Sequence, residues 1–97
     1  MKIMISQPMN GKSEMQIRKE RRPIIKELEK QGFEVIDTIF TEEPPHDVDE
    51  GIYFLAKSIE VMSKVDYVVF MNGWEKARGC RIEQQIAIEY KKNIIFV

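Results

Sequence analysis

Short apolar runs alternate along the chain with longer stretches in which apolar residues recur every three or four positions. Four runs have the brevity and the β-branched content that are typical of strands. They are residues 2–6, 33–38, 66–71 and 93–97. Three stretches have the periodicity of amphipathic helices. They are residues 14–31, 51–64 and 80–91. The pattern therefore predicts the element order βαβαβαβ.

The periodic positions also predict which face of each helix is buried. These positions are Ile17, Ile24 and Leu28 in the first helix, Ile52, Leu55, Ile59 and Met62 in the second, and Ile82, Ile86 and Tyr90 in the third. Ser13 is predicted to cap the first helix, and Gly32 is predicted to end it. Pro23 lacks a backbone donor, which predicts a kink or a restart of this helix near Arg22.

This element order predicts a parallel sheet with helices on both faces, because crossovers between parallel strands are right-handed. Ligands of such sheets bind beyond the carboxyl ends of the strands. The loops after the first and third strands, residues 7–12 and 72–79, would both open onto that edge. Residues 40–50 are acidic and interrupted by proline, so they are predicted to form the longest loop.

Length, charge and hydropathy narrow the class of protein. A chain of 97 residues has the length of one domain, which we expect to span residues 1–97. The formal net charge of −1 gives no positive field that would hold a nucleic acid polymer. The basic run at residues 18–22 is interrupted by an acid and is predicted to be a solvated helix face. No apolar stretch is long enough to span a membrane, so we expect a cytoplasmic protein without a membrane partner.

The chain has one cysteine and one histidine, which excludes an internal disulfide and a structural zinc site built from these residues. His46 lies in the acidic loop and is predicted to be solvated rather than catalytic. Cys80 stands near the start of the third helix, where a thiol can be activated. A phosphatase-type loop would require arginine at position 86, which is Ile86, so a packed cysteine is the favoured interpretation.

Residues 72–79, which lead into the third helix, form the most informative stretch. Gly79 would allow close approach of a ligand, and the free amides of the helix start would favour an anion. The stretch fits neither the dinucleotide fingerprint nor the phosphate loop. Glu83 follows about one turn into the helix, where the helix dipole should help to keep it ionised. Such a carboxylate can attack a cationic sugar carbon, but from spacing alone a simple partner of the helix dipole is the favoured interpretation.

Three segments resemble the nucleoside 2-deoxyribosyltransferase family, above all its small, mostly uncharacterised phage and bacterial members. They are KIMISQPM at residues 2–9, AKSIEVMSKVD at residues 56–66 and GWEKARGCRIE at residues 73–83. The resemblance covers nearly the whole chain. It implies a single flavodoxin-like three-layer α/β domain, with a parallel sheet of about four strands and three helices. It also implies a small-molecule nucleoside or nucleotide as substrate, no metal or redox cofactor, and a homo-oligomer.

The resemblance further implies roles for individual residues. Glu83 matches the family's nucleophile, which attacks the anomeric carbon of a 2-deoxyribosyl group and passes the sugar to another base or to water. Ser58 stands where characterised relatives carry an acid that protonates the leaving base. Met9 replaces the family's aromatic residue, so Trp74 is expected to stack on the base. The residues expected to contact the substrate are Gln7, Pro8, Met9, Ser58, Gly73, Trp74, Arg78, Gly79 and Arg81.

Three classes of function follow from these observations. The first is an enzyme acting on the N-glycosidic bond of a deoxynucleoside or deoxynucleotide. Arg78 and Arg81 favour a phosphorylated substrate, with a pair of surface charges as the equal alternative interpretation. The second is a nucleotide-binding module of the same fold without turnover, for which Ser58 and Met9 are the arguments. The third is a small structural domain that assembles through its sheet edge.

Overall fold

The structure is a computed structural model that describes residues 1–97. Four parallel strands form its centre. They are β1 (Lys2–Ser6), β2 (Glu34–Ile36), β3 (Tyr67–Phe70) and β4 (Asn93–Phe96). Their order in the sheet is β2-β1-β3-β4, so the chain reverses direction across the sheet after β2. The carboxyl ends of β1 and β3 are adjacent, because Ser6 pairs with Phe70. The loops that follow these two strands therefore start side by side, as predicted.

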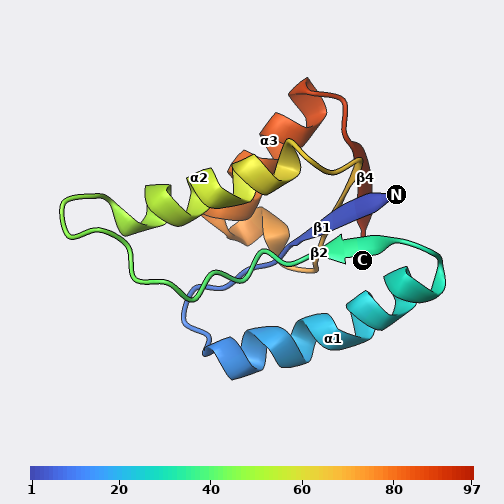
Figure 1. Ribbon diagram of the computed structural model, residues 1–97, viewed down its shortest axis with the longest axis horizontal. Coiled ribbons are helices and arrows are strands. Elements are labelled where there is room, and N and C mark those ends of the chain that lie inside the picture. Colours follow the sequence, from blue (N-terminus) through green and yellow to red (C-terminus); the bar gives the residue numbers. More distant parts are fainter.

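Three helices cover both faces of the sheet. Helix α1 (Glu14–Lys30) lies on one face, and α2 (Glu50–Met62) and α3 (Arg78–Glu89) lie on the other, as Figure 1 shows. A short 3-10 helix, η1 (Trp74–Lys76), precedes α3 within the loop after β3. The predicted three-layer, flavodoxin-like α/β domain is confirmed. None of the three helices is long and apolar enough to cross a membrane.

The strands alternate their side chains between two apolar clusters, one on each face of the sheet. The cluster beneath α2 and α3 consists of Met4, Met62, Val65, Val68, Phe70 and Ala87. The cluster beneath α1 consists of Ile3, Ile5, Leu28, Val69 and Met71. Because β1 and β3 are covered on both faces, their continuous apolar sequences are explained.

The predicted buried face of the third helix is confirmed only at Ile86, which packs against the cluster beneath α2 and α3. Helix α3 buries Cys80, Glu83 and Ala87, whereas Ile82 is 38% exposed and Tyr90 is 75% exposed. The small Ala87 side chain packs within the cluster of Met4, Val68 and Phe70, which fixes the inner side of the helix. The second helix differs at its start only, where Ile52 is 66% exposed.

The predicted restart of the first helix near Arg22 is wrong, because α1 is continuous from Glu14 to Lys30. Pro23 leaves the carbonyl of Lys19 without its helical donor. Both residues are exposed, so water can hydrogen-bond this carbonyl. The predicted ends of the helix are confirmed: the Ser13 side chain accepts a hydrogen bond from the Gln16 amide, and Gly32 has a φ of +93°.

Candidate active site at the carboxyl edge of the sheet

A cavity of about 1180 Å³ lies at the carboxyl edge of β1 and β3. Its walls are the loops after β1, β2 and β3, the first two turns of α2 and the start of α3. The loops after β1 and β3 come close together at the cavity, because a Cβ atom on Gly73 would lie 3.7 Å from Cγ of Pro8. Gly73 has a φ of +89°, a conformation that glycine adopts without strain. The cavity is thus at the position where parallel sheets bind ligands.

Most of the predicted site residues line this cavity. They are Glu83 and, among the expected substrate contacts, Gln7, Pro8, Met9, Ser58, Gly73, Arg78, Gly79 and Arg81. They come from three segments that are far apart in the sequence. The fold therefore brings together the residues that the resemblance had singled out one by one.

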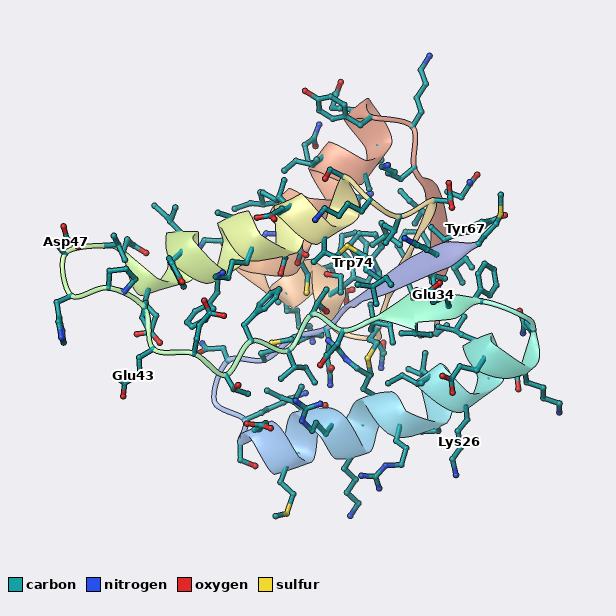
Figure 2. The ribbon with its side chains drawn as sticks, viewed as in Figure 1. Lys26, Glu34, Glu43, Asp47, Tyr67 and Trp74 are labelled. Atoms are coloured by element: carbon teal, nitrogen blue, oxygen red, sulfur yellow. The ribbon has the colours of Figure 1, made fainter.

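Trp74 does not line the cavity, so its expected stacking role is not supported. Its ring packs against Phe70 and Phe96, with centroid distances of 5.6 Å and 5.4 Å. Figure 2 shows the side chain between the sheet and the helices α2 and α3. The 3-10 turn directs this ring toward the apolar cluster, where its large surface is better buried than in the cavity. The aromatic residues of the cavity are instead Phe40 and Phe54.

The two cavity phenylalanines lie on segments that are held together. Phe40 is in the loop after β2, and Phe54 is in α2. Near them, Glu42 accepts a hydrogen bond of 2.6 Å from the Tyr53 hydroxyl and pairs with Lys57 Nζ at 2.9 Å. This exposed contact ties the acidic loop to α2. Sequence reasoning treated the loop as a connection only and missed Phe40.

Glu83 is a buried carboxyl at the cavity. It is 7% exposed, and its Oε1 accepts a hydrogen bond of 3.1 Å from the Ser6 hydroxyl. Burial raises the pKa of Glu83 to about 7, against smaller lowering effects of the Ser6 hydrogen bond and of the Arg21 charge. The expectation that the helix dipole keeps it ionised is therefore not supported. Glu83 lies in the second turn of α3, where the dipole has little effect, and desolvation dominates.

Cys80 is packed beside this carboxyl, as the favoured interpretation predicted. It is 3% exposed. Burial raises the pKa of its thiol, whereas an activated cysteine needs a lowered pKa. Cys80 is thus a buried neighbour of Glu83 and not a nucleophile at neutral pH.

The basic run at residues 18–22 contains an unexpected buried charge. Arg21 is 1% exposed, although Lys19 and Arg22 are exposed as predicted. Its Nε donates to Gln7 Oε1 at 2.9 Å, and its Nη1 donates to Thr38 Oγ1 at 3.0 Å. The predicted solvated face is wrong at this position. Helix α1 turns Arg21 toward the end of β1, where the polar groups of Gln7 and Thr38 receive it.

Gln7 is expected to contact the substrate, but its side-chain amide is fully engaged within the protein. Its Nε2 donates to the Ile17 carbonyl at 3.0 Å and to Glu20 Oε1 at 3.1 Å, while its Oε1 accepts from Arg21. The residue is 4% exposed. Gln7 thus anchors the loop after β1 to α1, and its side chain has no free N–H donor for a substrate.

Basic residues surround the start of α3. Lys76, Arg78 and Arg81 all line the cavity, and Arg81 Nη1 donates to the Glu75 carbonyl at 3.1 Å. No side chain caps this helix at Ala77. The rim at this end of the cavity therefore combines positive side chains with the amide end of a helix. No group of three or more His, Cys, Asp or Glu side chains is arranged to hold a metal ion.

Comparison with known families adds one assignment. The model of a family described as a domain of unknown function, DUF4406, matches residues 1–96. The chain belongs to this family. No curated protein and no solved structure matches it significantly. Membership of DUF4406 assigns no activity, so the resemblance to nucleoside 2-deoxyribosyltransferases stays a prediction, and the cavity geometry is the basis for a proposal.

Proposed function

We propose that the protein is an enzyme that cleaves the N-glycosidic bond of a 2-deoxyribonucleoside or its monophosphate, with Glu83 as the nucleophile. The observation that carries this proposal is a buried carboxyl held by Ser6 at the cavity on the carboxyl edge of the sheet. A carboxylate in such a place can attack a sugar carbon that is developing positive charge.

The chemistry is a double displacement at the anomeric carbon. A carboxylate oxygen of Glu83 forms a bond to C1′ as the bond from C1′ to the base nitrogen breaks. The electron pair goes to the base, which takes a proton from water. A water molecule or the N–H nitrogen of a second base then attacks C1′, gives its proton to the hydroxide left by the first step, and releases the Glu83 carboxylate. Two inversions leave the anomeric configuration retained.

The cavity walls suit a nucleoside with a phosphate. Phe40 and Phe54 offer apolar surfaces for the base, in place of the ring expected from Trp74. Arg78 and Arg81 favour a phosphate, because guanidinium groups match its oxygens in pairs. The monophosphate is therefore the preferred substrate form of this proposal.

The test is release of base from a panel of deoxynucleosides and their monophosphates, with and without free acceptor bases, followed by chromatography. Wild type is expected to release base from at least one substrate, and Glu83→Gln is expected to lose about 1000-fold in rate or more. Glu89→Gln is the matched control, because Glu89 lies on the same helix, exposed and outside the cavity. Equal rates in Glu83→Gln and wild type, or no base release by wild type, would contradict the proposal.

A second candidate is a nucleotide-binding module without turnover. It is favoured by Ser58, which lines the cavity where characterised relatives of the resembled family carry an acid. Calorimetry separates the two candidates, because a module binds a deoxynucleotide and releases no base. The resemblance also implies a homo-oligomer, which light scattering of the purified chain tests. A purely structural domain would show neither binding nor turnover.

A further inference from the structure

Arg21 is the largest fully buried side chain in the protein. Burial lowers its pKa to about 10, so it is still charged at neutral pH. A buried charge is costly unless other groups compensate it. The carboxylate that pairs with it, Asp37, lies 3.7 Å from Nη1 on a side chain that is 58% exposed. Because this contact is long and its partner is solvated, it offsets little of the cost of burying the Arg21 charge.

The hydrogen bonds of Arg21 converge on the end of β1. Its Nε donates to Gln7 Oε1 at 2.9 Å, and its Nη2 donates to the Ile5 carbonyl at 3.4 Å. Thr38 completes the arrangement, since it accepts from Nη1 and donates to the same Ile5 carbonyl at 2.9 Å. The guanidinium fork thus fixes the residues on both sides of Ser6. Ser6 is the residue whose hydroxyl donates to Glu83.

The charge of Arg21 also acts on Glu83 directly. The two side chains make no ion pair, but the positive charge lowers the pKa of Glu83 while burial raises it. The other groups facing this carboxyl are Ser6 from β1 and Cys80 from its own helix. The further titratable groups of the cavity lining are Glu50, Lys76, Arg78 and Arg81.

We propose that Arg21 is a positioning residue for the Glu83 site: it holds Ser6 against Glu83 through Ile5 and Gln7, and its charge favours the carboxylate form that attacks the sugar. The catalytic part of this proposal rests on the proposed function. The effect of the buried Arg21 side chain on the ionisation of Glu83 is measurable without a substrate.

The experiment compares Arg21→Met, Arg21→Lys and wild type by 13C NMR titration of labelled glutamate side chains. The Glu83 signal is assigned by its absence in Glu83→Gln. Arg21→Met is expected to move the Glu83 titration midpoint upward by about one pH unit, because it removes the charge. Arg21→Lys retains a charge and is expected to stay near wild type. Arg22→Met is the matched control, since Arg22 is the exposed neighbour on the same helix.

The pH profile of kcat/KM is the second measurement. With an active substrate, the kcat/KM of Arg21→Met is expected to fall about fivefold at pH 7, because the ionised fraction of Glu83 falls from about one half to about one tenth. At pH 9 Glu83 is about nine-tenths ionised or more in wild type and in the variant, so nearly all of this loss is expected to be recovered. A merely structural arginine would lower thermal stability in both variants and leave both midpoints unmoved. That result overturns the proposal. An equal upward shift in Arg21→Lys and Arg21→Met would assign the effect to the lost hydrogen bonds and would overturn the part of the proposal that rests on the charge.

Two outcomes are distinguishable by design. If wild type releases no base but the NMR midpoint moves in Arg21→Met, the positioning role holds and the proposed function fails. If wild type releases base and the midpoint does not move in Arg21→Met, the proposed function holds and the positioning role fails. Should Arg21→Met not fold, Arg21→Gln serves the same comparison, because it is neutral and keeps N–H donors for Gln7 and Ile5.

Discussion

Ser6 is the side chain that hydrogen-bonds Glu83, and its contribution is measurable at the scale of a single residue. A hydroxyl that donates to a carboxylate stabilises the charged form, and such hydrogen bonds are worth about 1.5–3 kcal/mol. Ser6 is buried, so water does not readily replace it. The ionisation of Glu83 should therefore respond to the loss of this one oxygen atom.

We predict that Ser6→Ala moves the acidic limb of the kcat/KM profile to higher pH. The limb is expected near pH 7 in wild type, because burial raises the pKa of Glu83 to about 7 and only the carboxylate attacks. In Ser6→Ala the rate falls most at pH 6–7 and least at pH 9. Ser63→Ala serves as the control, since Ser63 is exposed at the end of α2. An unmoved limb in Ser6→Ala would show that this hydrogen bond does not set the ionisation.

Sequence reasoning found the residues whose chemistry is local and missed those whose role depends on packing. Glu83 was singled out by the resemblance, whereas its place in a helix start alone favoured a dipole partner, and it lines the cavity. Arg21 looks like any surface arginine, because nothing near it in the sequence indicates that Gln7 and Thr38 will receive it. Trp74 fails for a related reason, since a loop aromatic can turn toward a ligand or toward the core.

At the scale of elements, helix α1 contains a proline whose missing backbone N–H is not replaced by another donor of the protein. Pro23 is exposed in the interior of the helix, and the carbonyl of Lys19, itself an exposed residue, lacks its helical donor. The apolar contacts of Ile24, Ile25 and Leu28 with the sheet keep the helix continuous across this position. The helix therefore forms because of its packing and in spite of its proline.

We predict that Pro23→Ala stabilises the protein by about 1 kcal/mol or more. Alanine restores the amide donor to the Lys19 carbonyl and removes the helix penalty of proline, about 3 kcal/mol, while part of the gain is offset because proline restricts the unfolded chain. Urea denaturation measures the change. Lys19→Ala is the control for an exposed substitution one turn earlier and is expected to change stability by less than about 0.5 kcal/mol. A loss of stability in Pro23→Ala would refute this account of α1.

The element order, the helix ends and the parallel sheet were predictable because they depend on periodicity and capping. The fully buried face of α3 was not predictable from periodicity. Ile82, Ile86 and Tyr90 mark an apolar side, but the fully buried side carries the small Ala87 together with Glu83. A buried carboxyl in a helix is costly, so apolar periodicity alone selects the other side. The mismatch coincides with the candidate site, which is where local rules and function are expected to conflict.

At the scale of the whole molecule, the buried Glu83 carboxyl should make global stability depend on pH. The ordinary pKa is 4.5, and burial raises it to about 7 in the folded protein. Between these values the folded state retains a proton that the unfolded state has released. The free energy of unfolding therefore falls as pH rises from about 4.5 to about 7, by about 3 kcal/mol in total from this group. Above that window its contribution stays constant.

We predict that Glu83→Gln removes this dependence. At pH 5 the variant and wild type are expected to be similarly stable, because protonated Glu83 and glutamine are both neutral. At pH 8 the variant is expected to be more stable by up to about 3 kcal/mol, since it no longer buries a charge. Urea denaturation at pH 5, 6, 7 and 8 gives the difference, in which the other titrating groups cancel. If the difference in unfolding free energy between Glu83→Gln and wild type is constant across these pH values, Glu83 titrates normally. The acidic limb of the kcat/KM profile would then not be expected near pH 7.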